Sequence, residues 1–217
     1  MTMLMHSLIA LMAGGSGEST FAWDSATATA LITLTNSDRT AEADTSNFES
    51  VRGAKNDLNT ANGGKFYWEV LIDTLANTSD IWLGVKRVAD SAETSGNSPF
   101  PGSLGFALLR GSGSTNTAGA WTTPGTPGSY AASDVVMIAL DCDTGQMWFG
   151  ENGTWYDSGD PAGGTNPIFE DMPVTTDYCP FFSTDNTAGA VQVTLRATAA
   201  HLAHTIPSGF TALDGTT

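Results

Sequence analysis

The stretch "KFYWEVLID", residues 65–73, alternates between apolar and polar positions with a period of two. One side of the extended chain carries Phe66, Trp68, Val70 and Ile72. Such alternation is typical of a β-strand with one buried face. Similar runs recur as "ALITLTN", "DIWLGVKR", "LGFALLR", "QMWFGEN", "DYCPFFS" and "AVQVTLRA". Roughly ten to twelve short strands, with almost no helix signal beyond residue 20, predict an all-β fold, a two-sheet antiparallel sandwich or a barrel.

Turn-forming residues separate these strands. The 217 residues include 24 Gly and 9 Pro, and Asn36-Ser37-Asp38 lies between two strand-like runs as a predicted hairpin turn. The run "DVVMIALDC" is apolar on both faces, which predicts a central strand covered on each side.

We expect residues 21–217 to form one sandwich domain, with the apolar strand faces as its core. The predicted core includes Phe66, Trp68, Val70, Leu83, Ile138, Phe149, Phe181, Val193 and Leu195. Cys142 and Cys179 lie in apolar runs without a CxxC motif, so they are predicted to be buried free thiols.

The charge is sparse and strongly acidic. The chain carries 23 acidic and 8 basic residues, for a net charge of −15. Such a surface repels phosphate groups, so the charge argues against nucleic-acid binding and against docking on anionic lipid.

The first fourteen residues, "MTMLMHSLIALMAG", are apolar and end in a Gly-rich stretch. They lack the basic start of a signal peptide, and they are too short to span a bilayer. The predicted helical stripe comprises Met1, Leu4, Met5, Leu8, Leu11 and Met12. We expect residues 1–20 to be an anchor arm with a glycine hinge that docks on another subunit. The alternative is a helix that folds back on its own domain.

The segment "LDCDTGQMWFGENGTW" contains residues that could bind a metal, cleave a sugar or form turns. Asp-Thr-Gly and Asn-Gly favour turns, which accounts for Asp141, Asp143, Gly145, Asn152 and Gly153. A calcium loop beginning at Asp141 would place Asn152, not Glu, at its twelfth position.

A glycoside hydrolase is the enzymatic alternative. Asp141 and Asp143 would lie about 6–7 Å apart along one strand face, near the separation of an inverting pair. A general acid, however, needs a desolvated site, and a turn places Asp143 in solvent. We therefore expect no catalytic residues, no metal and no cofactor.

Three long segments, residues 88–103, 111–130 and 157–173, read as irregular loops. Loops on an all-β scaffold commonly carry recognition. The candidate ligand-binding residues are their aromatic side chains, expected to be exposed: Phe100, Trp121, Tyr130 and Tyr156. For Trp121 the alternative is a core residue on a short strand.

The motifs also follow the order of a known family. The segments are "SVRG", "GKFYWEV", "IWLGV", "SLGFALL", "VVMIALDCDTGQMWFGENGTW", "GDPAGGTNP", "YCPFFS", "VQVTL" and "IPSGFTAL". Over about residues 21–213 they resemble the SPRY (B30.2-like) domains of the concanavalin A-like superfamily. The resemblance implies two curved antiparallel sheets, no catalytic residues, no metal, and mostly protein ligands held by loops at one sheet end.

Animal SPRY proteins usually carry RING or B-box partner domains, whereas here an apolar arm and a glycine hinge precede the sandwich. In this the chain resembles SPRY-type proteins of bacteriophage tails and virions. The resemblance implies a non-enzymatic module of a tail, fibre or baseplate, present in multiple copies in the virion. Its implied partners are other virion proteins, through residues 1–14, and a host-surface protein or glycan, without membrane insertion. A capsid decoration protein and a carbohydrate-active enzyme are the alternatives.

Overall fold

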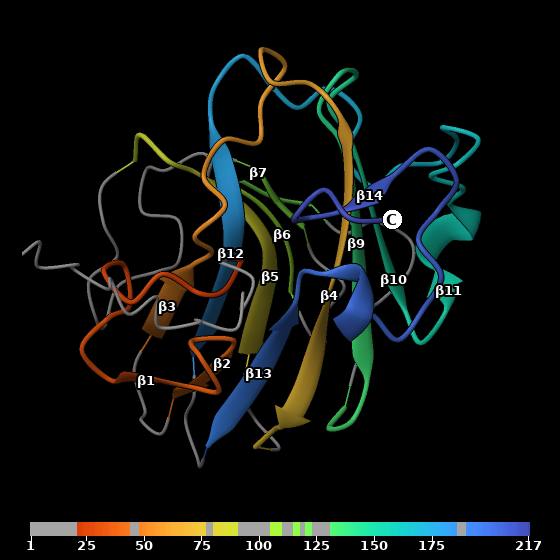
Figure 1. Cartoon of the computed structure of the whole chain (residues 1–217). Helices are drawn as coiled ribbons and strands as arrows, with labels where there is room; N and C mark the ends of the chain where they lie inside the picture. Colours follow the sequence, from red (N-terminus) through yellow and green to blue (C-terminus); the bar gives the residue numbers. More distant parts are fainter. Residues whose placement is uncertain are drawn as a thin grey trace, which may run out of the picture.

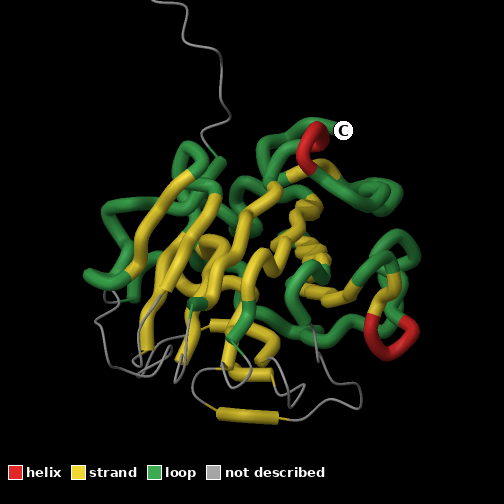
Figure 2. Tube along the Cα trace, turned by 90° about the horizontal axis from the view of Figure 1, so that it is seen from below, coloured by secondary structure: helices red, strands yellow, loops and turns green. Residues whose placement is uncertain are grey.

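A computed structural model describes residues 21–43, 48–76, 80–90, 105–109, 115–117, 120–122, 131–185 and 190–217. These residues form fourteen strands and two short 3-10 turns, η1 (Tyr156–Ser158) and η2 (Ala199–His201). Among these described residues, Figure 2 shows helix only at these two turns, which lie at the periphery. None of the helices among the described residues has the length and hydropathy that a membrane crossing requires.

The strands build two sheets, which Figure 1 shows as two layers. The eight-stranded sheet has the order β1 (Ile32–Thr35), β2 (Thr40–Ala43), β13 (Val191–Arg196), β4 (Lys65–Thr74), β9 (Val135–Asp141), β10 (Gln146–Glu151), β11 (Thr154–Trp155), with β14 (Thr211–Ala212) parallel to β4. The six-stranded sheet has the order β3 (Phe48–Arg52), β12 (Tyr178–Asp185), β5 (Asp80–Arg87), β6 (Gly105–Leu109), β7 (Thr115–Thr117), β8 (Ala120–Thr122). The predicted antiparallel two-sheet sandwich is confirmed.

The core lies between the sheets, as the alternation predicted. All the predicted core residues are buried except Phe66, which is partly exposed and packs against the main cluster. Phe181 joins a smaller cluster with Trp82 and Ala107, apart from the main one. Cys142 and Cys179 are buried free thiols, as predicted.

Two details differ from the sequence analysis. The structure has more strands than the ten to twelve expected, because strands of two or three residues are too short to show a period. Two of them, β7 and β8, lie within residues 111–130, which read as an irregular loop.

The strand β9 is buried along its whole length, which confirms a central strand covered on both faces. Its outer face is covered by residues 197–213, which we call the C-terminal strap. The cluster beneath and within the strap comprises Tyr67, Met137, Ala139, Trp148 and Phe210, with Trp155, Leu202 and Ile206 partly buried around it. Tyr67 and Glu69, on the polar-looking face of "KFYWEVLID", are therefore also interior.

A fully buried carboxylate, Glu69, fixes the strap to the sheet. Its Oε2 accepts the N–H of Ala203 at 2.7 Å, and its Oε1 accepts the N–H of His204 at 2.8 Å. The Tyr67 hydroxyl donates to Oε1 at 2.7 Å, and Arg196 Nη1 lies 3.7 Å from Oε2. Burial, and then the adjoining Glu69 carboxylate, raises the pKa of Tyr67 well above its ordinary value, so the hydroxyl stays a donor.

Replacing Glu69 should therefore loosen the strap. The change Glu69→Ala leaves buried donors and the Arg196 guanidinium without their acceptor, and we expect it to cost about 3–5 kcal/mol in the free energy of unfolding. Urea unfolding followed by tryptophan fluorescence measures this. The exposed Glu170→Ala is the matched control and should change stability by less than about 0.5 kcal/mol. Equal effects of the two changes would contradict the role given to Glu69.

Candidate functional site

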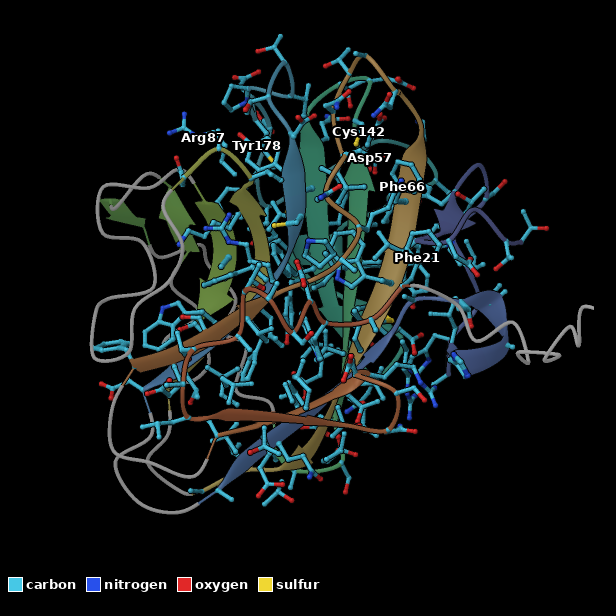
Figure 3. The ribbon with its side chains drawn as sticks, turned by 60° about the vertical axis from the view of Figure 1, so that its left-hand side comes forward. Phe21, Asp57, Phe66, Arg87, Cys142 and Tyr178 are labelled. Carbon is cyan, nitrogen blue, oxygen red and sulfur yellow. The ribbon has the colours of Figure 1, made fainter. Side chains whose placement is uncertain are left out.

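Four segments meet at one end of the sandwich, and we call them the loop end: residues 53–64, 87–90, 141–145 and 170–177. Backbone hydrogen bonds join neighbouring segments, from Thr60 N–H to Val174 C=O at 2.7 Å and from Val88 N–H to Asp177 C=O at 2.9 Å. Figure 3 shows Arg87 and Tyr178 at the same end as Asp57 and Cys142. These bonds link segments 53–64 and 87–90 to segment 170–177, so the segments pack against one another.

The hairpin between β9 and β10 is a turn, as its residue types predicted. Asp141 Oδ1 accepts the N–H groups of Asp143 at 2.9 Å and Thr144 at 3.2 Å. Gly145 has a φ of +74°, and a Cβ there would lie 2.5 Å from the carbonyl oxygen of Met172. Only glycine suits this position, because an L side chain is strained at this φ and clashes with the neighbouring backbone.

The remaining oxygen of Asp141 is also engaged. Lys65 Nζ lies 2.9 Å from Asp141 Oδ2, and the carboxylate is only 2% exposed. Burial opposes its ionisation, but the hydrogen bonds from Lys65, Asp143 and Thr144 outweigh burial, so the pKa of Asp141 lies below its ordinary value of 3.8. A carboxylate held ionised in this way suits a structural role and not that of a general acid.

Asp143 also serves the backbone, because its Oδ1 accepts the N–H of Gly64 at 3.3 Å. Within the described part of the chain, no group of three or more His, Cys, Asp or Glu side chains is placed to hold a metal ion. The two aspartates that suggested calcium or glycoside chemistry instead join β9 to the start of β4.

A buried arginine fixes the base of the segment that follows β5. Arg52 Nη1 donates to the carbonyl oxygens of Arg87 at 3.4 Å and Val88 at 3.1 Å, and its Nη2 donates to that of Asp90 at 3.2 Å. Arg87 in turn forms an ion pair with Asp90. The first residues of the predicted recognition segment 88–103 are thus held rigidly against the end of β3.

This geometry can be compared with known proteins. The family model of the SPRY domain matches residues 65–196, more than half of the chain. The chain belongs to the SPRY domain family. The assignment confirms the family resemblance that the order of motifs indicated, and it indicates a protein-interaction module.

Solved structures share the SPRY fold. The SPRY domain of human HERC1 matches with a TM-score of 0.58 and 15% identity, covering 80% of this chain and 96% of that chain. Stonustoxin matches with a TM-score of 0.53 and 16% identity, covering 81% of this chain and 26% of the toxin chain. At these identities the likeness concerns the fold alone. Among curated proteins, none matches the sequence.

One of the four aromatic candidates of this SPRY domain is not exposed. Tyr156 is only 8% exposed, and its hydroxyl donates to Glu151 Oε2 at 2.7 Å. The expectation of an exposed stacking ring is wrong for this residue, because η1 turns it back into the main core cluster. The preceding Asn152-Gly153 turn is confirmed by positive φ angles of 49° and 87°.

The remaining candidates are spread over the chain. Trp121 lies in β8, the short strand that the alternative predicted, while Phe100 and Tyr130 lie outside the described residues. The segment after β5 leaves from the loop end, and Lys86 pairs with Gly105 where β6 begins. Thr122 pairs with Thr115 at the other end of these strands. The predicted recognition segments therefore start from both ends of the sandwich.

The third segment, residues 157–173, packs along β10. The Trp148 indole N–H donates to the carbonyl oxygen of Thr165 at 2.8 Å, and Met147 forms backbone bonds with Phe169. The sequence analysis missed both Arg52 and Glu69. For Glu69 the available signal was a carboxylate between Trp68 and Val70 in the centre of a largely apolar strand. The polar sequence FESVR of β3 gives no such signal for Arg52.

The ion pair at Asp141 gives a pH-dependent prediction. Because the folded state lowers the pKa of Asp141, its contribution to stability is present above the ordinary value of 3.8 and is lost as the pH falls through the folded value. We expect Asp141→Asn to lower the free energy of unfolding by about 1–3 kcal/mol at pH 7, and the difference should shrink below pH 4.

Urea unfolding between pH 2 and 8 measures this dependence. The exposed neighbour Asp143→Asn, in the same turn, is the matched control, and its profile should follow the wild type more closely. A stability difference for Asp141→Asn that stays constant from pH 7 to pH 2 would contradict the assigned ion pair.

Proposed function

We propose that this SPRY domain is a non-enzymatic binding and structural module of a bacteriophage particle, in a tail, fibre or baseplate. In this role it recognises a host-surface protein or glycan. The observation that carries the proposal is a SPRY sandwich in which hydrogen bonds hold the first residues of a long loop, joined to an apolar N-terminal stretch of residues 1–14. The proposed location is therefore the virion, and the proposed copy number is several per particle.

The state of the carboxylates supports a binding module. Asp141 holds a turn and Lys65, and Glu69 holds the C-terminal strap. Both groups are almost fully buried and have their oxygens occupied by donors. Neither carboxylate is exposed for contact with a substrate.

The fixed start of the segment that follows β5 supports a role in recognition. The guanidinium of Arg52 holds residues 87–90, so the segment that follows starts from a fixed position. A binding loop that starts from an ordered base loses less conformational entropy when it meets its partner. The side chains proposed to contact the host are Phe100, Trp121 and Tyr130.

The chain around residue 21 supports an anchor that is separate from the sandwich. Lys55 Nζ lies 5.9 Å from the ring centre of Phe21 and 5.2 Å from that of Phe66. Trp23 also bridges to Gly53, so the domain is ordered from its first described residues. The Gly-rich stretch before residue 21 then acts as the hinge, and the Met and Leu stripe of residues 1–12 docks in a groove of another virion protein.

Removing the anchor tests the attachment. We expect a variant lacking residues 1–14 to unfold at the same temperature as the full chain and yet to be absent from purified particles. Mass spectrometry of the particles measures its occupancy. Full occupancy of the shortened chain would exclude the proposed anchor. Electron microscopy of labelled particles separates a tail location from a capsid decoration.

Substituting the aromatic residues tests recognition. We expect Phe100→Ala and Tyr130→Ala to weaken adsorption of the labelled protein to host cells by about tenfold each, because buried aromatic contacts dominate interface energies. The control is Tyr156→Phe, which removes only a buried hydroxyl and should leave adsorption unchanged.

Two outcomes would contradict the proposed role. Unchanged adsorption in both alanine variants would exclude these side chains from the interface. Release of new reducing ends from host polysaccharide that disappears in Asp143→Asn would instead show a glycoside hydrolase.

A further inference from the structure

The strand β1 lies at one edge of the eight-stranded sheet, at the lower left of Figure 1. Its inward-facing side chains, Ile32 and Leu34, are half-buried against the core, while Thr33 and Thr35 are exposed. Leu31, just before it, is the exposed large apolar side chain of the described residues, at 42%. An edge of this kind presents backbone groups that can pair with another strand.

The register shows which backbone groups of β1 point outward. Leu195 N–H donates to Arg39 C=O, so Arg39, Ala41 and Ala43 direct their hydrogen bonds toward β13. Because hydrogen bonds alternate in direction along a strand, the backbone N–H and C=O groups of Thr40 and Glu42 point toward β1. There these two residues pair with Thr35 and Thr33.

The residues between them, Ile32 and Leu34, direct their N–H and C=O groups away from the sheet. The N–H of Ile32 bonds locally to Thr29 C=O. Leu34 pairs with Ala41 of β2 at a position where its own backbone bonds point outward, and among the described residues no backbone bond outside the strands involves it.

Other described edges are protected or short. The free side of β3 is covered by the chain before β1, through bonds from Thr29 N–H to Ser50 C=O at 3.0 Å and from Asp24 N–H to Arg52 C=O at 2.7 Å. At the opposite edge of the larger sheet, β11 has only two residues. The strand β1 has no Pro, no Lys and no bulge, the features that normally block edge pairing.

The charge distribution favours a second copy of this chain as the partner. Two molecules of net charge −15 repel each other over most of their surfaces, yet residues 25–37 contain no charged side chain. Antiparallel pairing of two β1 strands about a two-fold axis at Leu34 places each Leu34 opposite its equivalent. It also places Thr33 opposite Thr35, and Thr–Thr pairs are favourable across strands.

We propose that two copies of this protein associate through their β1 strands and join their eight-stranded sheets into one continuous sheet. At the centre, each Leu34 N–H donates to the Leu34 C=O of the other copy. The half-buried Ile32 and Leu34 side chains of both copies then cover one another on the inner face. This association is independent of the proposed virion role and of residues 1–14.

Charge substitutions on the exposed face test the pairing without disturbing the core. In the antiparallel register, a Thr33→Lys/Thr35→Lys variant places lysine opposite lysine at both positions, and a Thr33→Glu/Thr35→Glu variant places glutamate opposite glutamate. We expect wild-type protein to show a concentration-dependent dimer in sedimentation equilibrium. Each variant alone should have a dimer Kd raised more than tenfold, and an equimolar mixture should form a heterodimer.

The control carries the same charge change away from β1, as Thr144→Lys/Thr154→Lys at two exposed positions, and should dimerise like the wild type. Thermal unfolding of every variant checks that the fold is kept. A wild type that stays monomeric at millimolar concentration would overturn the proposal. So would a dimer that persists in the Thr33→Lys/Thr35→Lys variant, or a mixture of the two charged variants that stays monomeric.

Discussion

The central strands β4, β9 and β10 of the eight-stranded sheet must be covered on both faces, and the rest of the structure depends on this constraint. The inner face is buried against the second sheet, and the outer face carries Tyr67 and Trp148, which are too large and apolar to remain in solvent. The C-terminal strap provides the second cover, and it can do so because Glu69 accepts its N–H groups. The match to the SPRY family model ends at residue 196, so the strap lies beyond the matched segment.

An acidic group at the loop end, like Glu69, holds separate segments together by accepting hydrogen bonds. A buried carboxylate is stable only when donors surround it, and Asp141 meets this requirement with two N–H groups and Lys65. These bonds hold the ends of β4 and β9 in place. Arg52 holds the chain after β5, because its guanidinium donates hydrogen bonds to the carbonyl oxygens of Val88 and Asp90. The first residues of the segment after β5 are therefore held at a defined position beside the end of β3.

Covering the faces leaves the edges to be closed separately. The chain before β1 closes the edge at β3, whereas β1 itself ends the larger sheet with outward-facing backbone groups. In a strongly acidic molecule, the uncharged run around β1 is also where another copy meets the least repulsion. The outward-facing backbone groups and the absence of charge therefore both favour β1 as the surface for self-association.

The sequence by itself determined the longer strands, the turns and the inner core, because a period of two and residues such as Asn152-Gly153 act over a few neighbouring positions. It also carried the motif order of a SPRY domain. Only the tertiary structure decided that Tyr67 and Glu69 are interior, that Tyr156 is buried, and that the predicted loops start from opposite ends. These properties depend on segments far away in the chain, such as the strap over β4, and no local pattern records which distant segment will cover a given face.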